Sequence, residues 1–321
     1  MPGLRPLKPT PPPLAMSPKL QTFLKRLLST VILIAVLAGV VIWHHPLGYA
    51  ALICVLCNLC TIEWYRMLSG HAQESNRWLI LAAGLIYPWA MAWITLCPAE
   101  SFDQLEGNPF DFSPELQESL PITLFAFKYL MGYTLLAFVL ELLRMDYRGQ
   151  GAQQALRSLG TTLLAFIFPV WLFCFALQSL LDFPFNIFPL LWLIIVTKLC
   201  DVYAYVCGVL VGGKLIKRPF SPAVSPKKTW EGIIGSFILT AITGWLLMEP
   251  MVGDLSVAAF FIVVMPCIFV FSVAGDLAGS LIKRGLGVKD SGSLLPGIGG
   301  IYDLLDSPAF TIALVVLTIS L

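Results

Sequence analysis

The chain has 321 residues, of which 58% are hydrophobic and only 12% are charged, and its mean hydropathy is +0.83. Soluble domains carry about 45–50% apolar and about 25% charged residues, so this composition argues against a water-soluble protein. The apolar residues form continuous runs rather than alternating segments, which argues against an outer-membrane barrel. The predicted fold class is an all-α, polytopic integral membrane protein.

The predicted elements begin with a proline-rich, weakly basic tail at residues 1–26, which we expect to be flexible and cytoplasmic. No small-residue cleavage site follows the first apolar run, which indicates a retained helix and not a signal peptide. Nine apolar segments of roughly membrane-spanning length then follow: about 27–43, 47–66, 78–97, 122–143, 159–181, 187–212, 231–249, 255–284 and 307–321. We divide the chain into the tail, N-terminal transmembrane helices at 27–181, and a C-terminal transmembrane catalytic region at 182–321 with a cytoplasm-facing site.

The distribution of Lys and Arg predicts the orientation of these helices. Of 20 such residues, only Lys128 and Lys198 fall inside the predicted spans away from their ends, and the rest lie in the tail and near 66–77, 144–157, 214–228 and 283–289. Segment 98–121 has six carboxylates and no Lys or Arg. If the helices alternate, all basic segments share one side, so the positive-inside rule predicts a cytoplasmic N-terminus and an external C-terminus.

Several polar side chains in apolar surroundings have both structural and functional interpretations. Lys128 can extend to the membrane surface, while Glu63 and Glu141 lie near cytoplasmic helix ends, where structural pairing is the simpler explanation. Lys198 and Asp201 are three residues apart and can neutralise each other on one helix face. The eight cysteines are predicted to be small packing residues, with no disulfide and no metal bound to sulfur.

Two polar segments precede the last helices. In DVYAYVCGVLVGGK, at 201–214, Asp201 and three other residues recur at helical spacing, which fits either close packing or ligand approach. In SPAVSPKKTWEG, at 221–232, a proline-rich loop carries Lys227 and Lys228, and Thr229 can cap a helix that begins near Trp230. Lysines beside a helix N-terminus form a plausible phosphate site, although they also fit flanking positive charge.

The densest polar segment follows Gly275 and includes SLIKRGLGVKDSGSLLPGIGGIYDLLDS at 280–307. Asp276, Ser280, Lys283 and Arg284 are spaced so that a helix would align them in one polar stripe. Asp303 and Asp306 are three residues apart and would point the same way. Mg²⁺ commonly takes one or two carboxylates together with substrate phosphates, so this pattern indicates phosphoryl or nucleotidyl transfer. A purely structural ion-pair network is the alternative.

These motifs resemble those of the phosphatidate cytidylyltransferase (CDP-diacylglycerol synthase) family, whose signature reads approximately S-x-x-K-R-x4-K-D-x-x-x-x-x-P-x-H-G-G-x-x-D-R-x-D. The positions that match in register are Ser280, Lys283, Arg284, Lys289, Asp290, Pro296, Gly299, Gly300, Asp303 and Asp306. The upstream elements D-x-x-A-Y and S-P-x-K-T-W-x-G match at Asp201, Ala204 and Tyr205 and at Ser225, Pro226, Lys228, Thr229, Trp230 and Gly232. The motifs lie within roughly 198–307, and earlier helices match only in hydropathy.

Two positions depart from the signature, because Ile298 replaces its histidine and Leu304 its arginine. The carboxylates implied to hold metal remain, so we expect the departures to affect rate, metal preference and lipid acceptor rather than reaction class. The glycines around Ile298 are still expected to present backbone amides to a phosphate. The protein is therefore predicted to be active.

The resemblance implies a Mg²⁺-dependent nucleotidyltransferase of phospholipid biosynthesis that converts CTP and phosphatidate to CDP-diacylglycerol and pyrophosphate. It implies Asp276, Asp303, Lys283 and Arg284 as catalytic residues and Asp276, Asp303 and Asp306 as metal ligands, with a second cation left open. The predicted substrate-binding residues are Lys214, Ser225, Lys227, Lys228, Ser280, Lys289 and Asp201.

The expected partners are CTP and membrane phosphatidate, without nucleic acid, and a homodimer is left open. The expected location is a bacterial inner membrane. One alternative is a CTP-dependent lipid kinase acting on a polyprenol, which would need the same residues. Another is a lipid transporter, which would usually place its binding groups near the midplane within repeated halves.

Overall fold

The computed structural model describes residues 18–69, 76–96, 114–148, 151–182, 186–253, 256–296 and 299–319. The first part of the chain forms α1 (Pro18–Trp43), α2 (Pro46–Ser69), α3 (Arg77–Leu96), α4 (Pro114–Arg148), α5 (Ala152–Phe166), a π-helix at Ile167–Trp171 and α6 (Phe175–Asp182). The second part forms α7 (Phe188–Val211), β1 (Pro219–Ser221), β2 (Ser225–Thr229), α8 (Trp230–Met251), α9 (Val257–Ala259), a π-helix at Phe260–Val264, α10 (Met265–Gly285) and α11 (Ile301–Ile319). The start of α1 lies within the predicted tail.

Seven helical stretches of the described chain are long and apolar enough to cross a membrane. They are Pro46–Leu68, Arg77–Leu96, Thr123–Met145, Ala152–Leu180, Phe188–Val211, Trp230–Met251 and Val257–Gly285. The first and ninth predicted segments, 27–43 and 307–321, overlap α1 and α11, although the last two residues of the ninth are outside the described chain. The prediction of an all-α, polytopic integral membrane protein is confirmed.

Two of the predicted helices are interrupted by wider turns. The fifth predicted segment passes from α5 through the first π-helix, which contains Pro169, before α6 begins. The eighth starts with α9 and the second π-helix, and Pro266 lies at the beginning of α10. Proline lacks the backbone N–H that the α-helical ladder requires, and π-turns are one way in which a helix accommodates such a break.

The segment at 221–232 is more ordered than the predicted proline-rich loop. Strands β1 and β2 pair antiparallel, with Pro219 opposite Thr229 and Ser221 opposite Ser225. Thr229 ends β2 and also caps α8, because its Oγ1 accepts a hydrogen bond from the Gly232 N–H at 3.1 Å. The predicted cap is confirmed, and the hairpin delivers its lysines directly to the start of α8.

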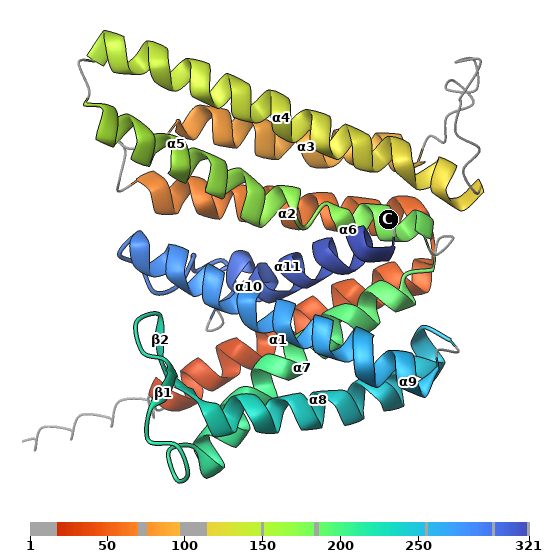
Figure 1. The fold of residues 1–321 in the computed structure, drawn as a ribbon. Helices are drawn as coiled ribbons and strands as arrows, with labels where there is room; N and C mark the ends of the chain where they lie inside the picture. Colours follow the sequence, from red (N-terminus) through yellow and green to blue (C-terminus); the bar gives the residue numbers. More distant parts are fainter. Residues whose placement is uncertain are drawn as a thin grey trace, which may run out of the picture.

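Helix α11 lies at the centre of the molecule (Figure 1). It contacts α2 and α6 on one side and α7 and α10 on the other, and its Ile312 and Ala313 are fully buried. In Figure 1, α3 and α4 lie above α2 and α5, while α7 and α8 lie below α10. The segment before α7 and the segment after it therefore meet on one central helix.

The seven cysteines within the described residues are free, and Cys97 lies outside them.

The ends of α2, α4 and α10 and the starts of α3, α5 and α11 lie at the same end of the helix bundle as the hairpin (Figure 1). These are the elements that border the basic segments of the sequence. The bundle thus gathers Lys and Arg at one end, as the alternating arrangement predicts. The signature residues lie at this end.

Candidate functional site

Lys283 is the centre of a buried charge cluster between α10 and α11. Its Nζ lies 2.7 Å from Asp303 Oδ1 and 3.3 Å from Asp306 Oδ2, and the residue is only 8% exposed. Helix α11 can approach because α10 has glycines on the facing side: a Cβ at Gly279 would lie 2.9 Å from the Asp306 Cβ, and one at Gly275 would meet Phe310. The small residues of α10 therefore bring both carboxylates to one ammonium group.

Helix α7 extends this cluster through a second lysine. Lys198 Nζ lies 3.5 Å from Asp201 Oδ2 and 3.3 Å from Asp306 Oδ1. Ser307 joins the same group by donating its hydroxyl to Asp201 Oδ2 at 2.9 Å. The predicted Lys198–Asp201 pair is present, and Asp306 connects it to the Lys283 cluster.

The hairpin contributes a third lysine. Lys228 of β2 forms an ion pair with Asp276 of α10, and both side chains are partly exposed. Asp276 follows Gly275, where a Cβ would lie 3.0 Å from the Asp306 carbonyl oxygen, so this ion pair lies beside the Lys283 cluster. Three parts distant in sequence therefore meet here: α7 and the α10–α11 pair contribute the signature carboxylates, and the hairpin contributes Lys228.

Asp303 also holds the segment that leads into α11. Its Oδ2 accepts hydrogen bonds from the Ser291 N–H at 2.8 Å, the Ser291 hydroxyl at 3.0 Å and the Gly300 N–H at 3.0 Å. Because Oδ1 contacts Lys283, both oxygens of this carboxylate have protein partners. Asp303 thus has a clear structural role in addition to the one predicted from the signature.

The expectation that the glycines around Ile298 offer amides to a phosphate is wrong for Gly299. Its N–H donates to the Leu295 carbonyl at 3.0 Å in an isolated antiparallel bridge. The next amides are also engaged, since Gly300 donates to Asp303, and Ile301 and Tyr302 donate to Glu63. Gly297 and Ile298 themselves lie outside the described residues. The amides of residues 299–302 are therefore bound within the protein and are not free for a phosphate.

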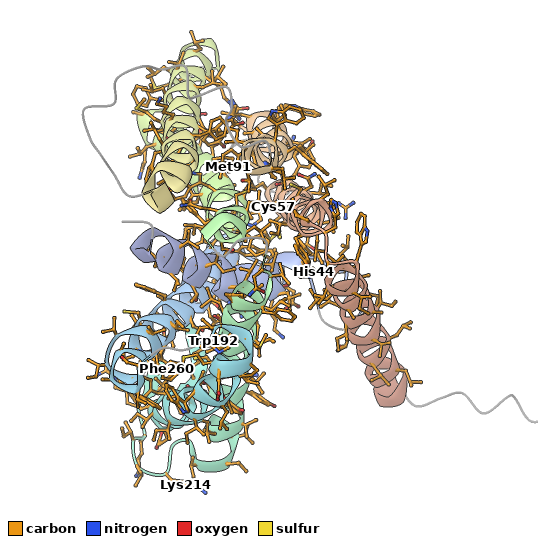
Figure 2. All side chains as sticks on the ribbon, turned by 90° about the vertical axis from the view of Figure 1, so that its right-hand side faces the viewer. His44, Cys57, Met91, Trp192, Lys214 and Phe260 are labelled. Carbon is orange, nitrogen blue, oxygen red and sulfur yellow. The ribbon has the colours of Figure 1, made fainter. Side chains whose placement is uncertain are left out.

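The remaining predicted residues lie nearer the solvent. Lys214 is exposed and donates to the Leu210 carbonyl at 2.7 Å, at the edge of the molecule in Figure 2. Arg284 is exposed and donates to the Val288 carbonyl at 3.3 Å. Lys227 and Lys289 are exposed, while Ser225 and Ser280 are half-buried. Leu304, the second departure from the signature, is also half-buried.

Two glutamates that the sequence did not assign to the site hold its segments. Glu231 accepts the N–H groups of Leu215 and Ile216 at 2.9 and 2.8 Å. Glu63, for which structural pairing was the simpler interpretation, accepts hydrogen bonds from Ser291 and from the first turn of α11. The position of Glu231 inside the SPAVSPKKTWEG motif was a usable signal, whereas no spacing connects residue 63 with residues near 300.

The carboxylates are compatible with a magnesium ion that also binds substrate. Among the residues that the structure describes, no three His, Cys, Asp or Glu side chains are placed to hold a metal by themselves. Mg²⁺ commonly needs only one or two carboxylates, because waters and substrate phosphates supply its other ligands. Asp276 and Asp201 have the most exposed carboxylates of the cluster, at 23% and 27%, whereas that of Asp306 is 4% exposed.

Comparison with known proteins agrees with the site's motifs. The profile of the cytidylyltransferase family matches residues 24–321. The chain is 38% identical over 126 residues to "Phosphatidate cytidylyltransferase" from Haemophilus influenzae, a stretch that covers 38% of this chain and 42% of that protein. The protein of the same name from Helicobacter pylori is 40% identical over 128 residues, which cover 39% of this chain and 45% of the relative.

A plant relative shows the same pattern. "Phosphatidate cytidylyltransferase 4, chloroplastic" from Arabidopsis thaliana is 44% identical over 118 residues, or 36% of this chain and 28% of the relative. The aligned stretches thus span less than half the length of these curated relatives. The family profile, in contrast, extends over nearly all of the sequence. The chain belongs to the cytidylyltransferase family.

Proposed function

We propose that the protein transfers the cytidylyl group of CTP to phosphatidate and releases pyrophosphate, giving CDP-diacylglycerol for phospholipid synthesis. The observation that carries this proposal is the cluster of three lysines and four aspartates at one end of the membrane helices. The family match and the printed names of the relatives support the same reaction. The relatives align over only part of their length, so their activity is carried over as a proposal.

In this reaction an oxygen of the phosphatidate phosphate forms a bond with the α-phosphorus of CTP. The bond from that phosphorus to the oxygen bridging the β-phosphorus breaks, and pyrophosphate leaves with the electron pair. The attacking phosphate is already anionic, so no protein nucleophile is required. The residues of the site position two polyanionic substrates and reduce their mutual repulsion.

The lysines are divided between two roles in this proposal. Lys283 is buried and bonded to two carboxylates, so it organises the cluster. Lys228 is partly exposed and, together with the exposed Lys227 and Lys289, is suited to contact phosphate oxygens. Arg284 is exposed at the same end of α10 and is suited to the same task.

We assign the proposed Mg²⁺ to Asp276 and Asp201, because their carboxylates are the most exposed of the cluster. When bound, the ion would neutralise phosphate charge and polarise the transferring group. Asp303 and Asp306 already bind Lys283 and neighbouring donors, which favours a supporting role for them. In this proposal Asp201 replaces Asp303 and Asp306 of the ligand set that the sequence predicts.

The site is further proposed to face the cytoplasm of a bacterial inner membrane, with the N-terminus on the same side. The gathering of basic segments at one end of the bundle supports this orientation. Reporters fused at residues 150, 220 and 290 should be cytoplasmic, while one after residue 110 should be external. An external reporter at 220 or 290 would separate the site from cytoplasmic CTP and refute the orientation.

The reaction is tested by following two labels of CTP separately. Purified protein is incubated with Mg²⁺, phosphatidate and CTP labelled on either the α- or the γ-phosphate. The α label should enter the lipid, and the γ label should leave as pyrophosphate. Entry of the γ label would indicate a lipid kinase, and absence of label from the lipid with every phosphatidate offered would refute the transfer.

The same assay tests the metal and Asp276. Addition of EDTA should stop the reaction and excess Mg²⁺ should restore it. The Asp276→Asn variant should lose about a hundredfold or more of turnover, because an amide supplies an oxygen without the charge. Glu249→Gln is the matched control, since this exposed carboxylate lies near the far end of α8, outside the cluster, and the variant should retain most activity.

A further inference from the structure

Glu63 connects the first part of the chain to the signature segment before α11. Its carboxylate accepts the Ile301 N–H at 2.8 Å and the Tyr302 N–H at 2.9 Å, and it shares the single hydroxyl proton of Ser291, 3.0 Å away, with Asp303. These partners are 228 to 239 residues away in sequence, and Glu63 is only 1% exposed. A buried carboxylate on α2 thus binds both ends of the segment 291–302.

The partners of Glu63 explain how its charge is accommodated. The first N–H groups of a helix have no partner within the helix, and the positive end of the helix dipole favours an anion there. Glu63 occupies this position at α11, and the ion pairs among the described residues do not include it. Its stabilisation therefore depends on the position of the α11 N-terminus.

Two glycines make this close approach available. A Cβ at Gly300 would lie 2.4 Å from Glu63 Oε2 and 1.9 Å from Ser291 Oγ, and a Cβ at Gly292 would lie 3.0 Å from Glu63 Oε1. No larger side chain fits at Gly300 without moving the carboxylate or the serine. The glycine-rich character of this segment is therefore tied to a residue on α2.

Glu63 is linked to Lys283 through two neighbouring residues of α11, Tyr302 and Asp303. Tyr302, whose N–H binds Glu63, precedes Asp303, and the Asp303 carboxylate binds Lys283 at 2.7 Å. The Tyr302 ring packs edge-on against Trp64 at 5.1 Å between centroids, and Lys283 Nζ lies 5.8 Å from the centre of the same ring. A displacement of the α11 start would therefore move Asp303 relative to Lys283.

We propose that Glu63 is a positioning residue of the transfer site, which holds the segment 291–302 so that Asp303 and Lys283 keep their places. This inference rests on the proposed cytidylyl transfer for its effect on activity, but the restraint itself can be measured without substrate. Gln at this position can accept one of the two backbone N–H groups, while its NH₂ group would face the other.

The test compares Glu63→Gln and Glu63→Asp with Glu141→Gln in lipid nanodiscs. Glu141 is the matched control, because it is also a buried glutamate near a helix end, 4% exposed and 3.6 Å from Arg144, but outside the cluster. Glu63→Gln should speed hydrogen exchange of the Ile301 and Tyr302 amides by about tenfold. Glu63→Asp, which keeps the charge on a shorter side chain, should give a smaller increase.

Activity provides the second measurement. Glu63→Gln should lower kcat by about ten- to a hundredfold and change KM for CTP much less, because all groups that bind CTP remain present but are displaced. Glu63→Asp should recover part of kcat, and Glu141→Gln should leave it near the wild-type value. Each kcat is calculated per folded protein, because a loss of folded protein would also lower the apparent kcat at unchanged KM.

The outcomes separate the two proposals. Unchanged exchange at 301–302 in Glu63→Gln would refute the restraint, and faster exchange with unchanged kcat would refute its role in the reaction. Loss of kcat equal to that of Glu141→Gln would also refute it. An inactive wild type would instead refute the proposed function, and the exchange measurement would still decide whether Glu63 holds the segment.

Discussion

Two basic segments at the same end of this molecule are each held by a glutamate, but from very different distances in sequence. The segment after α7 is held by Glu231, which accepts the N–H groups of Leu215 and Ile216 only 16 and 15 residues away. The segment before α11 is held by Glu63, more than 200 residues away. The first restraint is local, whereas the second links the two parts of the chain.

This difference shows how the proposed site depends on the whole fold. The hairpin segment and α8 form a unit whose capping residue and anchor both lie within residues 229–231. Asp303 is a local anchor for Ser291 and Gly300, but the Ile301 and Tyr302 amides at the start of α11 bind the distant Glu63. Changes near α8 should therefore act locally, while changes around α11 should be transmitted between α2, α7 and α10.

The largest expected effect is that of Lys283→Met. This change leaves Asp303 and Asp306 without their shared ammonium group in a buried cluster. Loss of one partner of a buried ion pair typically costs about 3–5 kcal/mol of unfolding free energy. Thermal unfolding in detergent measures the loss. Arg284→Met is the control, since loss of that exposed side chain should change stability by less than about 0.5 kcal/mol. An equal loss of stability in the two variants would contradict a buried ion-pair cluster around Lys283.

A smaller and confined effect is expected for Glu231→Gln. The exchange of the Leu215 and Ile216 amides should become about tenfold faster, because both N–H groups bind the charged Oε1 and a neutral amide oxygen is a weaker acceptor. The exchange of the Ile301 and Tyr302 amides should not change. In the double variant with Glu63→Gln, the effects of the two substitutions on amide exchange should be additive, as expected of sites without shared partners. Faster exchange at 301–302 in the Glu231 variant would show that the two restraints are coupled.

The cap between the hairpin and α8 should matter less. Thr229→Ala removes the acceptor of the Gly232 N–H and should reduce stability by about 1 kcal/mol, measured by thermal unfolding. Thr229→Ser keeps the hydroxyl and should lose less stability than Thr229→Ala. It also removes the Thr229 methyl group, which packs so close to Gly212 that a Cβ there would lie 2.8 Å from it. If Ser and Ala are equally destabilised, packing rather than capping is the main contribution of Thr229.

The smallest effect is predicted for Lys214→Met. Lys214 is exposed, and its Nζ donates to the carbonyl of its own helix end. Its loss should change stability by less than about 0.5 kcal/mol and should lower activity less than Lys228→Met does. Steady-state kinetics with CTP and phosphatidate make the comparison. A greater loss for Lys214→Met would return it to the substrate-binding set that the sequence predicts.

The parts of this structure that could be predicted from sequence are those set by local rules. Apolar length predicts the membrane helices, spacing predicts the Lys198–Asp201 pair, and capping chemistry predicts Thr229 before α8. The motif order also groups Lys283 with Asp303 and Asp306. Each of these depends on residues close in sequence or on a signature with fixed spacing.

The features that escaped prediction depend on packing between distant elements. Two such features are the ion pair between Asp276 and Lys228 and the hydrogen bonds from the start of α11 to Glu63. In each case the partners lie on separate helices or strands. The amides of residues 299–302 look free in the sequence because it does not show that the Leu295 carbonyl and Glu63 accept three of them. The division of the chain at residues 181 and 182 stays a prediction, and the contacts of α11 cross that boundary.

The central place of α11 also has a consequence for how the protein is made. In chain order, α11 follows α2, α6, α7 and α10, all of which it contacts. During synthesis, the Glu63 carboxylate would already be in place on α2 long before the Ile301 and Tyr302 amides emerge from the ribosome. An unpaired carboxylate near the bilayer is costly, so Glu63 is fully satisfied only after the last helix has packed.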